Sequence, residues 1–341
     1  MIYFAIIGMG NIGIRHARHI AQHPETALLA VCDIQSKRLT VLSEQYPYAK
    51  QFADYHQLLQ IPALDVVNVC TPNYLHADMS VAALEAGKHV VCEKPMALST
   101  AECERMIDAA AANERKLFVV KQNRYNPPVV AVKQLLDTGV LGKVYQINVN
   151  CFWNRNDDYY LHSEWHGRKA LDGGCLFTQC SHFVDVMYYL IGKVNCVGGI
   201  IKNAGHGSAI EFEDTGSFVL ESLSGAIIGF NFSTCAFAHN MEGSITIIAQ
   251  NGTVKIGGQY LNTIEYQQIN NKIHIDLPPQ AGNSFNDYGT YRGSMSNHDK
   301  IIQNVVDTLQ NRADIATSGE EGKCVVEIIE NMYQVAQKTK I

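Results

Sequence analysis

The sequence predicts an α/β protein in which a doubly wound parallel sheet precedes an α+β domain built on an open, mostly antiparallel sheet. Strand-like and helix-like segments alternate over the N-terminal third, and a glycine-rich turn follows the first strand. The pattern changes beyond Pro127-Pro128, and from Val194 to Asp276 strand-like segments follow one another without intervening helices. At 341 residues the chain is long enough for two domains, and the change of pattern divides it into residues 1–121 and 122–341.

The N-terminal segments are typical of βαβ units. Strands are expected at Ile2–Ile7, Ala27–Cys32, Val66–Cys70, His89–Cys92 and Leu117–Val120, and helices at Asn11–His23, Ser36–Tyr46, Asp54–Leu59, Tyr74–Ala86 and Thr100–Asn113. The strands are apolar throughout rather than alternating. A parallel sheet that is covered by helices on both faces requires this pattern.

The C-terminal part mixes elements differently. Helices are expected at Val129–Asp137, Gly174–Leu190, Asn297–Gln310 and Glu320–Gln337, and β-type segments begin at Lys143 and then fill Val194–Asp276. A polar stretch, Asn154–Asp172, separates the first strand from the second helix. Consecutive strands that are joined by Gly/Asn turns favour an antiparallel sheet.

Composition limits the partners of the chain. Its net charge of −6 argues against a nucleic-acid partner held by phosphate contacts, and no apolar run approaches the ~18 residues of a membrane span. The ten cysteines include no CxxC pair, and several lie inside apolar runs, as free thiols in a reducing compartment do. The N-terminus lacks the basic segment of a signal peptide. We therefore expect a cytoplasmic protein.

The glycine-rich turn is the first candidate binding site. It comprises Gly8, Met9, Gly10, Asn11, Ile12 and Gly13, after a strand and at the start of a helix. In this context the first glycine permits a tight turn, the second lets a pyrophosphate approach the backbone, and the third lets the helix pack on the strand. A GxGxxG motif alone is weak evidence, because the same glycines also occur at turns without a cofactor.

Asp33 lies about 20 residues beyond the turn, at the end of the second strand. Its carboxylate can accept hydrogen bonds from ribose hydroxyls and would repel a 2′-phosphate, which favours NAD over NADP. Lys37 and Arg38 follow it, and either could neutralise a phosphate. The alternative is that both are exposed charges on the next helix.

The ends of the third and fourth strands face the same crevice of a doubly wound sheet. The residues expected there to contact the cofactor are Thr71, Pro72, Asn73, His76, Glu93 and Lys94. Lys94 is suited to exchange a proton with a hydroxyl that is being oxidised, because the pKa of a partly buried lysine moves readily. The alternatives are an ordinary surface lysine at Lys94 and a packing or capping role for His76.

Two groups of metal-ligand side chains are weighed and set aside. His162 and His166 have i,i+4 spacing, but their segment is polar and not clearly helical. Cys175, Cys180 and His182 do not converge on one face of a helix. We expect no metal.

The order GMGNIG, CD, TPNYLH, CEKP and QNRYNP resembles the Gfo/Idh/MocA oxidoreductase family over nearly the whole chain. The EKP triplet in this position is the most specific element. The resemblance implies that Lys94 touches nicotinamide and substrate, that Arg124 lies near the cofactor, and that the chain forms a homodimer or homotetramer.

The segment Asp172–Asp185 is similar to the family's G-G-G-x-L-x-D-x-G-x-H-x-x-D pattern. This similarity implies that His182 is the catalytic histidine and that Asp185 is the second acidic residue. On one helix Thr178, His182 and Asp185 would share a face. Thr178 departs from the pattern, because the family has an aspartate there.

That departure, with Gln179 and the Trp165 and Leu171 segments, resembles the branch that oxidises UDP-N-acetylglucosaminuronate or related sugar nucleotides at C3. The substrate residues expected from this resemblance and from the basic charges nearby are Lys94, Tyr159, Arg168, Thr178, Gln179, His182 and Arg292. Arginine forks match phosphate oxygens in pairs, so the basic set Arg155, Arg168, Lys169 and Arg292 is a candidate for holding a diphosphate. The alternative is that these are scattered surface charges paired with Asp157, Asp158 and Glu164.

The expected function is hydride transfer between a sugar hydroxyl and NAD, with Lys94 accepting the hydroxyl proton and His182 steadying the developing charge. Three alternatives stay open at this point. They are a dehydrogenase of a free sugar or inositol, an enzyme that retains NAD for hydrolysis or elimination, and a non-catalytic NAD(P)-dependent sensor.

Overall fold

A computed structural model describes residues 1–277, 285–287 and 292–338 of the chain. The chain divides into two compact units, one of Met1–Lys121 with His298–Val326 and one of Gln122–Asn297 with Glu327–Ile341. The first boundary lies where the sequence pattern changes. The second differs from the expected division, because the segment from His298 to Val326 returns to the first unit.

The first unit is built from alternating strands and helices, as expected. Its strands are β1 (Ile2–Ile7), β2 (Thr26–Cys32), β3 (Lys50–Phe52), β4 (Val66–Val69), β5 (His89–Cys92) and β6 (Leu117–Val119). Its helices are α1 (Asn11–Gln22), α2 (Ser36–Gln45), α3 (Tyr55–Leu59), the 3-10 turn η1 (Asn73–Leu75), α4 (His76–Glu85), α5 (Thr100–Ala112) and α11 (His298–Leu309), and α12 (Gly319–Lys338) begins here. The short strand β3 was not foreseen, because its residues are mostly exposed.

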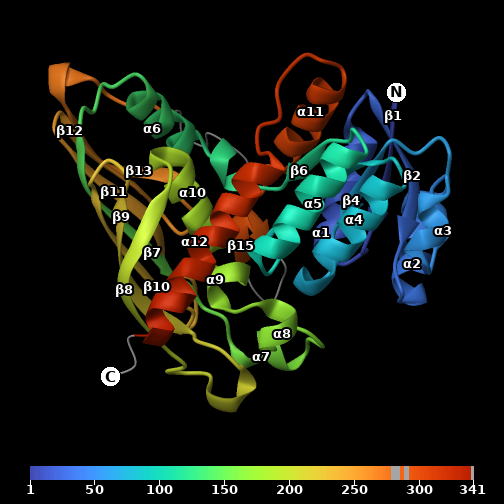
Figure 1. Cartoon of the computed structure of the whole chain (residues 1–341), viewed down its shortest axis with the longest axis horizontal. Coiled ribbons are helices and arrows are strands. Elements are labelled where there is room, and N and C mark those ends of the chain that lie inside the picture. Colours follow the sequence, from blue (N-terminus) through green and yellow to red (C-terminus); the bar gives the residue numbers. More distant parts are fainter. Residues whose placement is uncertain (278–284, 288–291, 339–341) are drawn as a thin grey trace. The chain divides into compact units, whose positions relative to one another are not determined.

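The six strands form one parallel sheet in the order β3-β2-β1-β4-β5-β6. From β1 the strands are added first on one side, as β2 and β3, and then on the other side, as β4, β5 and β6. Right-handed crossovers therefore place the two sets of helices on opposite faces of the sheet. α1 packs with α11, and α4 packs with α5 (Figure 1). The predicted doubly wound sheet is confirmed. Strand β4 is buried along its whole length, and β1 is buried at every residue except Tyr3.

The second unit contains a seven-stranded sheet and several short helices. Its strands are β7 (Val144–Phe152), β8 (Val194–Lys202), β9 (Thr215–Ser222), β10 (Ile227–Ser233), β11 (Glu242–Ala249), β12 (Gly252–Gly257) and β13 (Thr263–Ile269), with a separate hairpin of β14 (Phe285–Asp287) and β15 (Arg292–Met295). Its helices are η2 (Gln122–Tyr125), α6 (Pro127–Asp137), α7 (Asp157–Leu161), α8 (Lys169–Asp172), α9 (Cys175–Thr178), α10 (Ser181–Ile191), η3 (Gly207–Ala209) and η4 (Asn270–Lys272).

The large sheet has the order β13-β12-β11-β7-β10-β9-β8, and all neighbouring pairs are antiparallel except β7 with β10. Burial alternates along β9, because its even-numbered residues face the core and its odd-numbered residues do not. α10 packs against β7 and against α6 (Figure 1). Helices cover one face of the sheet, and the other face carries the exposed residues. This is the arrangement typical of the open, mostly antiparallel sheet that the sequence predicts.

The expected single helix over Gly174–Leu190 is wrong in one respect. The chain forms two helices, α9 and α10, with Gln179 and Cys180 between them. This break brings the sulfur atoms of Cys175 and Cys180 to 3.9 Å, which a continuous helix would not do. It also places Thr178 and His182 on different helices, so their relation is set by the break and not by an i,i+4 repeat.

No described helix combines the length and the apolar character that crossing a membrane would require.

Candidate functional site

The glycine-rich turn joins β1 to α1, and each of its glycines meets a different constraint. Gly8 has φ +93°, and a Cβ atom there would lie 2.6 Å from the carbonyl oxygen of Cys70. A Cβ on Gly13 would lie 2.0 Å from the carbonyl oxygen of Gly8. A Cβ on Gly10, by contrast, would meet no described atom within 4 Å. The turn is thus closed toward the protein and open at Gly10.

The residues around this opening fit a dinucleotide. α1 starts at Asn11 with no described side chain capping its first turn and no acidic residue in it, so its N–H groups remain suited to a pyrophosphate. The Asp33 carboxylate accepts hydrogen bonds from the backbone N–H groups of Met9 and Gln35, both at 2.8 Å. Arg38 reaches the same carboxylate at 3.2 Å and is half-exposed. Asp33 therefore lies beside the turn, as expected.

The segment after β4 is fixed by His76. Its ring nitrogens lie 2.7 Å from the carbonyl oxygen of Pro95 and 2.9 Å from that of Thr71. Burial lowers the pKa of His76, and the two carbonyl contacts offset part of that effect. His76 thus ties the ends of β4 and β5 together. Thr71 Oγ1 is buried without a hydrogen-bond partner among the described residues, which leaves it suited to a ligand.

Glu93 turns its carboxylate into the first unit. Oε2 accepts the backbone N–H of Lys94 at 3.0 Å, while Oε1 lies 2.9 Å from Nε2 of His16 and 3.4 Å from Nε2 of His298. Burial alone would raise the pKa of Glu93, but the two histidines hold it well below its usual range. Glu93 therefore fixes the main chain of Lys94, whose side chain is partly exposed.

In the second unit, His182 lies near the start of α10 and is 4% exposed. Its Nε2 lies 3.4 Å from Ser294 Oγ, and Ser294 Oγ accepts a hydrogen bond from Gln122 Nε2 at 2.8 Å. Ser294 and Gln122 thus form a short chain of polar contacts that ends at Nε2 of His182. Asn297 Nδ2 donates to the carbonyl oxygen of Gln122 at 3.1 Å and holds this chain of contacts.

Thr178 is paired with a carboxylate that the sequence did not single out. Its hydroxyl donates to Oδ1 of Asp172 and lies 3.1 Å from the Asp172 carbonyl oxygen. The other carboxylate oxygen of Asp172 accepts the Gly167 N–H at 2.9 Å, and Asp172 is 1% exposed. Because the hydroxyl proton points to Asp172, Thr178 presents its oxygen to any other partner as an acceptor.

Arg155 is buried beside the break between α9 and α10. Its Nε donates to Oε1 of Gln179 at 2.8 Å, and Gln179 Nε2 donates to the Tyr159 hydroxyl at 2.9 Å. The Tyr159 ring stacks on His166 with 4.5 Å between centroids. The guanidinium lies 5.1 Å from the centroid of Trp153. These side chains form a connected polar cluster in which the buried Arg155 contacts Gln179, three residues before His182.

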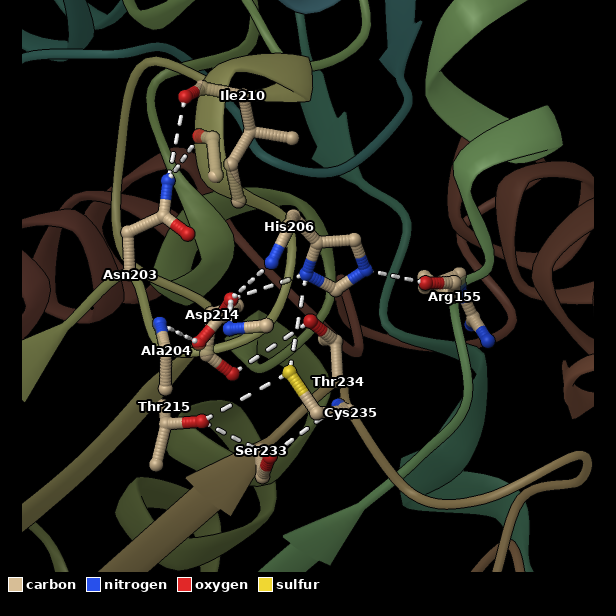
Figure 2. Close-up of polar contacts among 12 residues, drawn as sticks. Arg155, Asn203, Ala204, His206, Ile210, Asp214, Thr215, Ser233, Thr234 and Cys235 are labelled. Carbon is tan, nitrogen blue, oxygen red and sulfur yellow. Dashed lines mark hydrogen bonds and ion pairs between the residues drawn. The ribbon is translucent and has the colours of Figure 1, made fainter.

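The main chain of Arg155 is held from a different loop. His206 Nε2 donates to the Arg155 carbonyl oxygen at 2.5 Å, and Figure 2 shows the same ring facing Asp214 through Nδ1, at 3.0 Å. Asp214 is fully buried and accepts the N–H groups of Ala204 and Gly205, both at 2.8 Å.

Comparison with known proteins identifies the family. Residues 2–121 match the GFO/IDH/MocA oxidoreductase family with an NAD-binding Rossmann fold, and residues 129–255 match the GFO/IDH/MocA C-terminal domain. The chain is similar over 99% of its length to the WlbA dehydrogenase of Bordetella pertussis, solved with NADH and UDP-GlcNAcA, with 31% identity, 97% of that chain covered and a TM-score of 0.88. The chain belongs to the Gfo/Idh/MocA family.

Two further relatives describe the range of this family. The WlbA dehydrogenase of Chromobacterium violaceum, also solved with NADH and UDP-GlcNAcA, is 32% identical, with 99% of this chain and 94% of that chain covered and a TM-score of 0.88. Inositol 2-dehydrogenase of Salmonella typhimurium is 26% identical over 309 residues, which are 83% of this chain and 89% of that protein. This Gfo/Idh/MocA protein is thus an NAD-dependent oxidoreductase that acts on sugar or polyol hydroxyls.

The resemblance places Arg124 near the cofactor, but in the structure this side chain forms an ion pair with Asp185. Its guanidinium forms a two-pronged ion pair with Asp185 of α10, in which Nη2 lies 2.8 Å from Oδ1 and Nε lies 3.1 Å from Oδ2. Both side chains are buried, and the guanidinium also lies 4.8 Å from the centroid of Tyr189. A cofactor contact by Arg124 stays a prediction.

The remaining expected residues differ in how well they are placed. Arg168 precedes α8 and is exposed, and Arg292 begins β15, but its side chain lies outside the described part of the chain. His162 is exposed and lies after the end of α7, 3.7 Å from Asp158. Pro72 and Asn73 stand where η1 begins.

Sequence reasoning missed the residues that support His182 and Thr178. Ser294 is 112 residues from His182, and no local pattern connects them. Asp172 is only six residues before Thr178, so an acidic residue close to the missing family aspartate was a usable signal.

Proposed function

We propose that this enzyme oxidises a sugar nucleotide, with the hydroxyl at C3 of a UDP-sugar or its uronate as the reacting group. The observation that carries the proposal is the buried Arg155, which Gln179 holds immediately before α10. A cation at this place suits an anionic substrate, because a guanidinium pairs with carboxylate or phosphate oxygens.

The comparisons support the same choice. The two solved structures bound to UDP-GlcNAcA are similar to this chain over nearly its whole length and at higher identity than the inositol dehydrogenase.

The chemistry at Thr178 also supports a sugar-nucleotide substrate. The family's aspartate is replaced by a hydroxyl that Asp172 orients, so the second unit presents a neutral acceptor at that position.

Bound NAD would supply the hydride acceptor for the carbon that bears the hydroxyl. We assign Nζ of Lys94 as the acceptor of the hydroxyl proton, and Glu93 and His76 hold the main chain on either side of Lys94 for this task. His182 donates a hydrogen bond that stabilises the alkoxide as it develops. In the reverse direction Lys94 returns the proton to the ketone oxygen.

The mechanism and the substrate class are tested by separate variants. Lys94→Met should lower kcat by about 10²–10⁴-fold and leave the Kd for NAD within a few-fold. Arg155→Met should raise KM for UDP-N-acetylglucosaminuronate by about tenfold or more, and Arg168→Ala and Arg292→Ala should raise it less. Lys193→Ala, an exposed basic residue after α10, serves as the control.

NADH formation is then followed with UDP-N-acetylglucosaminuronate, UDP-N-acetylglucosamine and inositol as substrates. Turnover should occur with the two UDP-sugars and not with inositol. Equal activity on inositol that none of the arginine substitutions affects would reject the sugar-nucleotide proposal and favour a polyol dehydrogenase.

We also propose that the protein is a cytoplasmic homodimer or homotetramer. All ten cysteines are free thiols, as in a reducing compartment. On the uncovered face of the seven-stranded sheet, register places a row of exposed apolar side chains, namely Ile200, Val219, Ile227, Ile248 and Tyr266. Such a face is typical of a self-association surface. Light scattering after gel filtration would test it, and a monomer at micromolar concentration would contradict it.

A further inference from the structure

We propose that His206, Asp214 and Cys235 form a Zn²⁺-binding site in the second unit. His206 lies in the loop after β8, Asp214 directly precedes β9, and Cys235 follows β10, and Figure 2 shows the three side chains facing one another. Each can offer one ligand atom, and the three atoms lie within 4.8 Å of one another. The proposal does not depend on the identity of the sugar substrate.

The separations fit tetrahedral zinc. Nδ1 of His206 lies 3.0 Å from Oδ2 of Asp214 and 3.7 Å from Sγ of Cys235. With bonds of about 2.0–2.2 Å to nitrogen or oxygen and about 2.3 Å to sulfur, tetrahedral angles require separations of roughly 3.3 Å and 3.5 Å. For these two pairs, shifts of a few tenths of an ångström would be enough, and the third pair, Oδ2 with Sγ, lies within 4.8 Å.

The surroundings orient the ligands for this role. Nε2 of His206 donates to the carbonyl oxygen of Arg155, which leaves Nδ1 as the nitrogen that can bind a metal. Metal-ligating histidines commonly use a backbone carbonyl in this way. Asp214 is fixed by the N–H groups of Ala204 and Gly205. Its carboxylate is thus held in place before any ion binds.

Protons occupy the place that the ion would take. Nδ1 and Oδ2 are both electron-rich, so their approach to 3.0 Å requires a proton or a cation between them. Sγ of Cys235 lies 3.7 Å from the same Nδ1. Binding of Zn²⁺ would release the proton from Nδ1 and the proton from Sγ, and one divalent ion would replace two protons.

The ligand set selects the metal, and the exposure of Cys235 permits entry. A thiolate, an imidazole and a carboxylate together favour Zn²⁺ over Mg²⁺ or Ca²⁺, which prefer oxygen ligands alone. Cys235 is exposed, so the fourth position can hold water. The other candidate group, His16 with Glu93 and His298, is fully buried and offers no such position.

The test is a zinc titration of the full-length protein after chelator treatment and reduction. A chromogenic chelator that competes for Zn²⁺ reports affinity and stoichiometry. We expect one equivalent to bind the wild type, and we expect Cys235→Ser and His206→Gln to weaken this binding by at least about 100-fold. Cys196→Ser and His162→Gln should bind like the wild type, since these residues lie outside the cluster. Mg²⁺ should not compete.

Thermal unfolding with and without Zn²⁺ separates loss of a ligand from loss of fold. Zinc should raise the Tm of the wild type and of both controls, because an ion that binds only the folded state stabilises it. Cys235→Ser should unfold near the wild-type Tm without zinc and gain nothing from zinc. Zinc affinity within threefold of wild type in Cys235→Ser, or no zinc binding by the wild type, would overturn the proposal.

Discussion

The buried ion pair between Arg124 and Asp185 can be tested by removing only the negative charge. Nη2 of Arg124 lies 2.8 Å from Oδ1 of Asp185, and the two side chains are 5% and 1% exposed. Asp185→Asn would leave a buried guanidinium without this carboxylate, and breaking such a pair costs about 3–5 kcal/mol. At about 2–4 °C per kcal/mol for a unit of this size, Tm should fall by roughly 6–20 °C.

Differential scanning calorimetry measures this shift, and Asp78→Asn is a suitable control. Asp78 forms an ion pair with Arg105 at 2.9 Å, but both side chains are largely exposed, so Tm should scarcely change. Replacing both members, as Arg124→Met with Asp185→Leu, should recover much of the lost stability. A normal Tm for Asp185→Asn combined with a large loss of NAD affinity would refute this reasoning and assign Arg124 to the cofactor.

Three other outcomes follow from the first unit. Gly13→Ala should destabilise the fold by about 1–3 kcal/mol or more, because its Cβ would meet a backbone oxygen at 2.0 Å, whereas Gly10→Ala should leave Tm nearly unchanged and weaken NAD binding about tenfold in a fluorescence titration. NAD should bind more tightly than NADP, and a preference for NADP would mean that Arg38, not Asp33, decides the choice. Burial lowers the pKa of His89 to about 4, so its contribution to stability is complete above about pH 6.5 and is lost as pH falls toward 4. The free energy of unfolding, measured by urea titration, should therefore change with pH by about 1–3 kcal/mol less in His89→Gln than in the wild type over that range. An unchanged pH dependence would contradict the role given to His89.

Within the first unit, most of the cofactor site could be read locally. Gly8 and Gly13 are needed because the chain approaches its own backbone within one turn, and Asp33 follows from where β2 ends. His76 was harder to interpret. Its position after the third expected strand was clear, but its two carbonyl partners follow β4 and β5 and depend on how these strands pair.

In the second unit, the sequence alone was less informative. The motif located His182, Thr178 and Asp185, but it implied one helix, and the break at Gln179 and Cys180 changes which side chains meet. Asp172 reaches Thr178 only because α8 ends in a left-handed glycine, Gly173 with φ +90°, and the chain turns back.

The sequence by itself determined the Rossmann sheet and the open glycine turn, because hydrophobic period and turn chemistry act over a few residues. The resemblance to the family's motifs identified Lys94 and His182 as candidates. Only the tertiary structure decided their partners. Ser294 on His182, Asp185 on Arg124 and Asp214 on His206 come from other elements of the chain. Such pairings depend on sheet register and helix packing, which bring distant residues within hydrogen-bond reach and which no local repeat encodes.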